Sequence, residues 1–154
     1  MKIGETIRAK KSSVSFEFFP PKEKAGEDKL IEGIKKLAKL NPTFVSVTCG
    51  AGGGSSRNTA PLVSRIKKET SLTVMPHQTC IDQTSTELKE ILEGYKKAQV
   101  ENVLALRGDP PAGTTEFKAI KGGFNHASEL IALAKSLGFS IGMAVYPEKH
   151  CESP

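Results

Sequence analysis

The stretch NVLALRGDPP, residues 102–111, is the clearest fold signal in the chain. Residues 103–106 are all apolar, which is typical of a strand buried on both faces of a parallel sheet. The apolar run ends at Arg107, Gly108 and Asp109, and two prolines follow. A basic and an acidic side chain beside a glycine, directly after a buried strand, indicate a ligand-facing strand end in an α/β protein.

The pattern of a strand followed by a helix recurs along the whole chain. Strand starts fall near residues 14, 44, 73, 102 and 140. One repeat therefore has about the length of a βα unit, ~30 residues. We expect strands at residues 14–19, 44–48, 72–75, 103–106 and 141–145, and helices at about residues 3–10, 27–40, 61–69, 84–98 and 126–137. Thr84 and Glu87 are expected to form a capping box, and Gly138 to end the last helix.

This repeat predicts the fold class, because right-handed crossovers between such units build a parallel sheet. Polar side chains gather after each strand and plain turns precede it, which is typical of a β/α (TIM) barrel. A closed barrel needs eight strands and about 250 residues, whereas this chain has 154 residues. We therefore predict a single domain, residues 1–154, that is an incomplete barrel. A flavodoxin-like open sheet also has five strands, so periodicity alone leaves that alternative open.

Composition narrows the classes of protein further. With 38% hydrophobic and 25% charged residues, the chain has an ordinary globular composition. It has no signal-peptide pattern and no apolar segment of the ~20 residues that span a membrane, so we expect a cytoplasmic protein. Cys49, Cys80 and Cys151 match no disulfide framework and are expected to stay reduced. The net charge is +5, but its lysine pairs are spread over separate segments, which argues against a nucleic-acid partner.

Glu17 is the candidate general acid. It alternates with Phe16 and Phe18, so the phenylalanines should pack under helices while Glu17 faces the barrel interior. A partly desolvated carboxylate there suits acid catalysis near neutral pH. The alternative is a structural glutamate paired with Arg107 or a lysine.

Three further groups of residues have two interpretations each. The glycine-rich loop at residues 50–56 is either a phosphate-binding loop or simply a flexible one. His77 and Cys80, with His150 and Cys151, match no standard zinc spacing, so a neutral His77 that stacks on or hydrogen-bonds to a planar ligand is favoured over a metal site. Arg107 and Asp109 could contact an anion and a heterocycle, or form a salt bridge.

Taken together, five motifs resemble the N-terminal half of the methylenetetrahydrofolate reductase family. They are SFEFFPPK (15–22), FVSVTCGAGG (44–53), PHQTC (76–80), LALRGDPP (104–111) and YPEKH (146–150). Their order and intervals make the resemblance specific over essentially all 154 residues. It implies a β/α barrel that binds FAD at the carboxyl ends of its strands. The implied reaction, in one-carbon and methionine metabolism, reduces 5,10-methylenetetrahydrofolate to 5-methyltetrahydrofolate with NADH or NADPH.

The resemblance also implies roles for individual residues. Glu17 resembles the general acid that helps to open the five-membered ring of the folate at N10. Asp109 would face both the cofactor and the pterin of the substrate. The positions at which the family contacts FAD are Thr48, Cys49, Ala51, His77, Arg107, Gly108, Asp109, Ala127, Tyr146, His150 and Ser153.

The chain departs from the family in two respects. Cys49 stands where bacterial relatives often have tyrosine. The family's later strands, which bring a glutamine and an arginine to the folate, have no counterpart here. The alternative to an active reductase is therefore a non-catalytic half-barrel, either a fragment or a subunit that needs a partner chain. Such a chain would form a homo-oligomer or bind a complementary C-terminal half.

Overall fold

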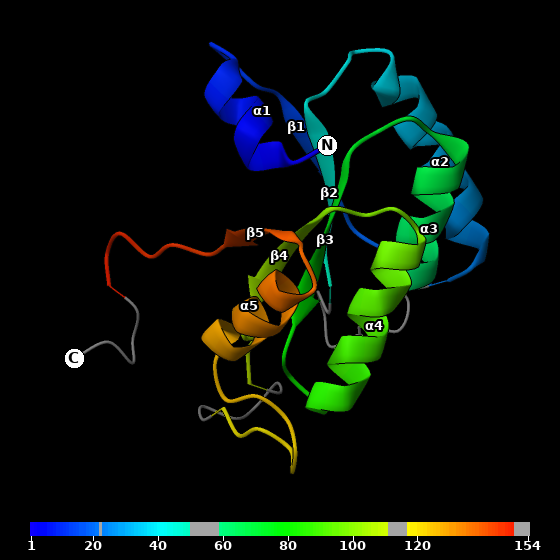
Figure 1. The fold of residues 1–154 in the computed structure, drawn as a ribbon. Helices are drawn as coiled ribbons and strands as arrows, with labels where there is room; N and C mark the ends of the chain where they lie inside the picture. Colours follow the sequence, from blue (N-terminus) through cyan, green and yellow to red (C-terminus); the bar gives the residue numbers. More distant parts are fainter. Residues whose placement is uncertain (22, 50–58, 111–116, 150–154) are drawn as a thin grey trace.

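The computed structural model describes residues 1–21, 23–49, 59–110 and 117–149 (Figure 1). These residues form five parallel strands in one sheet and five helices, in the predicted order. The strands are β1 (Ser15–Phe18), β2 (Phe44–Val47), β3 (Val74–Thr79), β4 (Asn102–Leu106) and β5 (Ser140–Met143). The helices are α1 (Ile3–Ala9), α2 (Ala25–Ala38), α3 (Thr59–Glu69), α4 (Ser85–Lys97) and α5 (Ala127–Ser136).

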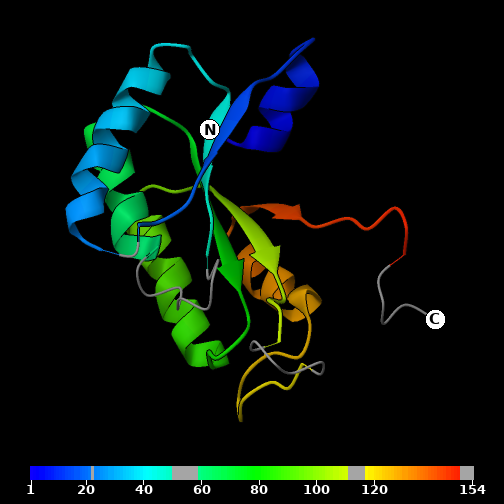
Figure 2. The ribbon, with the colours of Figure 1, turned by 180° about the vertical axis from the view of Figure 1, so that it is seen from behind.

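The order of the strands in the sheet decides between the two predicted architectures. Each strand pairs in parallel with the next one in sequence, which gives the order β1-β2-β3-β4-β5. Helices α2 to α5 all cover the same face (Figures 1 and 2). A flavodoxin-like sheet reverses its winding direction and carries helices on both faces. The flavodoxin-like alternative is therefore wrong, and the incomplete β/α barrel is confirmed.

The core lies between the sheet and these four helices. Val45 and Val47 of β2 and Val103 and Ala105 of β4 are buried at alternate positions, because successive side chains of a strand point to opposite faces. The helices contribute fully buried side chains at helical spacing, which are Ile31, Ile34, Leu62, Val63, Ile66, Leu88, Leu92, Tyr95, Leu130 and Ala134. Phe16 and Phe18 pack against the same core, as predicted. The intervening residues of the strands face the open side of the sheet.

Two helix boundaries confirm the local sequence signals. At the start of α4, the Thr84 hydroxyl accepts a hydrogen bond from the Glu87 N–H, and the Glu87 carboxylate accepts one from the Thr84 N–H. At the end of α5, Gly138 has φ +84°, a left-handed conformation that glycine adopts without steric cost.

β3 differs from its prediction. It runs over Val74–Thr79, whereas the expected strand ended before Pro76. Proline lacks an N–H and was expected to terminate the strand. Instead Pro76 pairs with Val47, the last residue of β2, and the strand continues along β4, where His77 pairs with Leu104. His77 therefore lies inside a strand and pairs with Leu104 of β4.

α1 lies at the ends where the strands begin (Figure 1). The Ile3 N–H donates to Asn102 Oδ1 at 2.8 Å, and Asn102 Nδ2 donates to the Met1 carbonyl at 2.9 Å. Asn102 is the first residue of β4 and is buried. Its side-chain amide thus fastens the N-terminal segment to the opposite end of the sheet from the candidate site.

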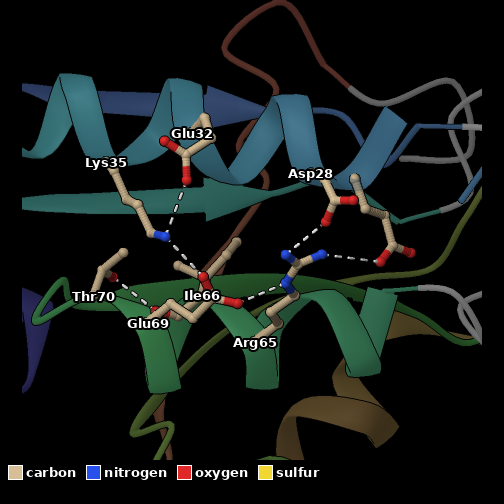
Figure 3. Close-up of polar contacts among 8 residues, drawn as sticks. Asp28, Glu32, Lys35, Arg65, Ile66, Glu69 and Thr70 are labelled. Carbon is tan, nitrogen blue, oxygen red and sulfur yellow. Dashed lines mark hydrogen bonds and ion pairs between the residues drawn. The ribbon is translucent and has the colours of Figure 1, made fainter. Parts of the chain in front are cut away.

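An ion-pair network joins α2 to α3 on the outer surface (Figure 3). Arg65 contacts Asp28 at 2.7 Å and Glu69 at 2.7 Å, and Lys35 contacts the other Glu69 oxygen at 2.9 Å. The hydrogen bond from Arg65, then that from Lys35, lowers the pKa of Glu69 below its ordinary value of 4.5. The carboxylate form of Glu69 is thus favoured in the folded chain.

We expect this network to make stability depend on salt and on acid. Arg65→Met should lower the melting temperature, and the loss should shrink at high salt because exposed charges are screened. The contribution of Glu69 should be fully present above pH 4.5 and be lost as the pH falls through its lowered pKa. Thermal unfolding followed by circular dichroism measures both effects. Lys89→Met, which removes one 3.9 Å pair with Glu93, is the control. Equal, salt-independent losses in the two variants would contradict the network.

Candidate active site

Three side chains from three neighbouring strands meet on the open face of the sheet. Glu17 of β1 stands in register with Ser46 of β2, and His77 of β3 lies diagonally across from Ser46. The Ser46 hydroxyl donates to Glu17 Oε2 at 3.2 Å, and His77 Nε2 lies 3.4 Å from the same oxygen. Ser46 and His77 are buried, whereas the Glu17 side chain is 49% exposed. Because Ser46 and His77 hold one oxygen of the Glu17 carboxylate while the side chain stays half exposed, this carboxylate can exchange a proton with a bound molecule.

Burial controls the charge of His77. Desolvation lowers the pKa of His77 below its ordinary 6.5, and the nearby Glu17 carboxylate opposes this shift in part. The imidazole is therefore neutral near pH 7, which agrees with the expectation of a neutral ring beside a planar ligand. A neutral histidine can hydrogen-bond to Glu17 without forming a full ion pair.

The segment that follows β4, residues 107–109, packs tightly beside β3 and is called the ledge. The Cys80 N–H donates to the carbonyls of Leu106 and Arg107 at 3.2 and 3.1 Å. Gly108 has φ +91°, and a Cβ at this position would stand 2.8 Å from a methyl of Ile81. The Arg107 guanidinium lies over the ring of Phe117, 4.7 Å from its centroid. The glycine between Arg107 and Asp109 is thus required by the left-handed backbone and by its close packing against Ile81.

Thr48 and Cys49 follow directly after β2. Thr48 Oγ1 is buried and has no hydrogen-bonding partner among the described residues, while its carbonyl accepts from the Thr59 hydroxyl at 3.3 Å. Cys49 Sγ lies 3.8 Å from Thr79 Oγ1. Buried hydroxyls usually have a partner, so an orphaned one at a strand end is consistent with a bound ligand.

The remaining predicted site residues are not all brought to this face. Asp109 is exposed beyond the ledge, and Ala127 is the partly exposed first residue of α5. Tyr146 is 54% exposed in the segment that runs away from the sheet after β5 (Figures 1 and 2). The predicted positions Ala51, His150 and Ser153, and the loop at residues 50–56, lie outside the described residues.

The residues of the zinc alternative are separated. His77 contacts Glu17, whereas Cys80 Sγ donates to the Leu106 carbonyl at 3.3 Å. Burial raises the pKa of Cys80 to about 11, so this thiol stays protonated at neutral pH and is a poor metal ligand. Within the described ranges, no three His, Cys, Asp or Glu side chains are grouped to hold a metal. His150 and Cys151, which the alternative also needs, lie outside those ranges.

Ser46 is the site residue that the sequence motifs did not single out. A serine in an alternating strand does not by itself indicate a functional role. The role of Ser46 follows from the pairing of β1 with β2, which places it beside Glu17. The usable clue was positional, because Glu17 and Ser46 each occupy the third place of their strands.

A parallel sheet whose strands lie side by side in sequence order, with polar side chains on its open face, defines a protein of the β/α-barrel type. A chain of the tryptophan synthase complex from Pyrococcus furiosus superposes with a TM-score of 0.59 at 11% identity, covering 90% of this chain and 60% of that one. MenC from Desulfotalea psychrophila gives a TM-score of 0.55 at 9% identity, covering 96% and 36%. At these identities the likeness concerns the fold alone. None of the described helices has the length and apolar character needed to cross a membrane.

Comparison of the amino-acid sequence with known protein families identifies the family of this chain. The profile of the methylenetetrahydrofolate reductase family matches residues 2–154, and the chain belongs to this family. It is 42% identical over 144 residues to 5,10-methylenetetrahydrofolate reductase of Buchnera aphidicola, covering 93% of this chain and 47% of that protein. The Escherichia coli enzyme is 41% identical over 142 residues, covering 92% and 46%. Methylenetetrahydrofolate reductase (NADH) 1 of Arabidopsis thaliana is 37% identical, covering 97% and 26%. The chain thus spans about half the length of these bacterial relatives.

Proposed function

We propose that this chain supplies the general acid and much of the flavin site of a reductase that converts 5,10-methylenetetrahydrofolate to 5-methyltetrahydrofolate. The electrons would come from NADH or NADPH. The observation that supports this most directly is the half-exposed Glu17 carboxylate, held by Ser46 and His77 on the open sheet face of a chain of this family. The name of the Arabidopsis relative specifies NADH, and no described residue here selects between the two nucleotides.

Glu17 is the proton donor in this proposal. Its Oε2 is occupied by the Ser46 hydroxyl and lies next to His77, so Oε1 is the oxygen available to a bound molecule. Protonation of N10 of the folate from Oε1 would weaken the ring C–N bond and generate the electrophilic carbon. General acid catalysis of this kind accelerates a reaction by roughly 10² to 10⁴.

The strand ends fit a flavin dinucleotide. When bound, FAD would accept hydride from the nicotinamide and deliver it to the folate carbon. The Thr48 hydroxyl lacks a partner among the described residues, Gly108 is a proposed contact after β4, and Arg107 brings positive charge for a pyrophosphate. The other proposed contacts are Cys49, Ala51, His77, Asp109, Ala127, Tyr146, His150 and Ser153. Asp109 can also accept hydrogen bonds from the amino and ring N–H groups of a pterin.

We further infer that activity requires the open sheet to be completed by more chain. Large apolar side chains are exposed at both of its edges. Val14 and Phe19, which flank β1, are 60% and 61% exposed, and Met143 and Val145 beside β5 are 57% and 76% exposed. Unpaired strand edges with apolar side chains favour association. A complementary C-terminal half or a second copy would cover them.

Flavin uptake tests both parts of this proposal. The purified chain is mixed with FAD, alone and together with the C-terminal half of the Escherichia coli relative. We expect the mixture to retain yellow flavin and to oxidise NADH with methylenetetrahydrofolate as acceptor. The chain alone should bind FAD weakly and self-associate in light scattering. Absence of flavin from both samples would contradict the reductase, and a well-folded monomer that binds no apolar dye would contradict the need for completion.

A further inference from the structure

We propose that Ser46 is a positioning residue for Glu17, which holds Oε2 against His77 and leaves Oε1 to face the bound substrate. This inference rests on the proposed function for its catalytic meaning. The contacts that support it lie among side chains of β1, β2 and β3.

The register of the sheet places Ser46 where it can do this. Glu17 and Ser46 are Cα partners across the β1–β2 ladder, so their side chains leave the same face of the sheet side by side. The next residue across the sheet is Met75, the partner of Ser46 on β3, which has no hydrogen to donate from its side chain. Lateral support for the Glu17 carboxylate in this row of residues therefore comes from Ser46.

The burial of Ser46 determines which group accepts the hydrogen bond from its hydroxyl. Ser46 is 5% exposed, so its hydroxyl has little access to water, and this hydroxyl donates its hydrogen bond to Glu17. A buried hydroxyl without a partner is unfavourable, so the Ser46 hydroxyl is held on Glu17. This hydrogen bond restricts the rotamers of the Glu17 side chain, so that its two carboxylate oxygens have different surroundings.

The two oxygens of Glu17 then have different roles. Oε2 accepts from Ser46 at 3.2 Å and lies 3.4 Å from His77 Nε2. A proton shared with substrate is therefore carried by Oε1. Without Ser46, the half-exposed carboxylate could rotate away from His77, and either oxygen could take the proton in a less suitable position. Misplacement by about 1 Å can cost roughly 100-fold in rate.

The first test reports on geometry without any activity. The titration of His77 is followed by NMR in the 154-residue chain, because Glu17 raises the pKa of His77 against the effect of burial. Ser46→Ala should lower the pKa of His77 further, since the carboxylate is no longer held beside it. Ser46→Thr, which keeps the hydroxyl, should restore the wild-type titration. Ser15→Ala, two residues before Glu17 on β1, is the matched control and should change nothing.

The second test uses the flavin-loaded, completed assembly. We expect Ser46→Ala to slow flavin reoxidation by methylenetetrahydrofolate roughly 10- to 100-fold, with flavin reduction by NADH unchanged. In the Glu17→Gln background, Ser46→Ala should cause no further slowing, because residues that act through one group are not additive. Ser46→Thr should recover most of the rate.

The outcomes separate this inference from the proposed function. An unchanged His77 titration in Ser46→Ala overturns the inference, whatever the enzyme does. A shifted titration with an unslowed folate step, or additive losses with Glu17→Gln, also overturns the positioning role. If the wild-type assembly shows no folate reaction at all, the proposed function fails, and the His77 titration still decides whether Ser46 holds Glu17.

Discussion

Glu17→Gln should slow flavin reoxidation by methylenetetrahydrofolate by roughly 10² to 10⁴, about 3 to 5 kcal/mol of barrier. Glutamine keeps the shape and the acceptor oxygen that Ser46 and His77 contact but has no transferable acid proton. FAD binding and NADH oxidation by an artificial acceptor should remain nearly intact. Stopped-flow absorbance of the flavin in the completed assembly measures the two half-reactions separately.

Asp109→Asn provides the contrast for this experiment. The Asp109 carboxylate is proposed to act on both the flavin and the pterin, so its loss should change the flavin potential and weaken folate binding together. A glutamate that only supports the fold would likewise damage both half-reactions, through lost stability. Equal slowing of flavin reduction and reoxidation in Glu17→Gln would therefore remove Glu17 from the role of acid.

Gly108→Ala should strongly destabilise the chain and abolish flavin uptake. The left-handed φ of +91° at this position costs an L-residue about 1–2 kcal/mol. The new Cβ would also stand 2.8 Å from Ile81 and 3.3 Å from Thr79, and overpacking of this kind adds roughly 1–3 kcal/mol. Urea unfolding measures the free energy of unfolding, and flavin fluorescence measures uptake.

Gly94→Ala is the matched control for the glycine experiment. Gly94 lies in α4, and a Cβ there would meet nothing within 4 Å. Alanine should therefore stabilise the helix by roughly 0.5–1 kcal/mol. Two alanine variants with similar free energies of unfolding would show that the ledge at the end of β4 is not strained by a side chain.

Element types and burial were predictable because they follow from short-range periodicity. Alternation in β1 predicted that Phe16 and Phe18 would face the core with Glu17 on the other side, and the core contacts confirm the phenylalanines. The capping pair Thr84 and Glu87 was predictable for the same reason, since the interaction spans one turn. Choosing the barrel over the doubly wound sheet required the pairing order of the strands, which periodicity does not contain.

Contacts between strands explain what sequence patterns could not predict. Ser46 matters through its register with Glu17, and that register is set by how two distant segments pair. The predicted extent of β3 was too short because proline locally disfavours a strand. Pairing of β3 with both β2 and β4 continues the strand past Pro76. The roles assigned to Tyr146, Ala51, His150 and Ser153 come from family resemblance and stay predictions.

The fastening of the N-terminal segment to Asn102 has a consequence for the order of folding. Neighbouring strands are close in sequence, as in the pairs Ser15 with Phe44 and Asn102 with Ser140, so the sheet can grow one unit at a time. The bond from the Ile3 N–H to Asn102 joins residues 99 positions apart. Closing a longer loop costs more entropy, by about 0.6 kcal/mol for each doubling of its length. During synthesis, the N-terminal segment therefore cannot make this hydrogen bond until β4 has emerged, and it is fastened to Asn102 after the intervening strands have been made.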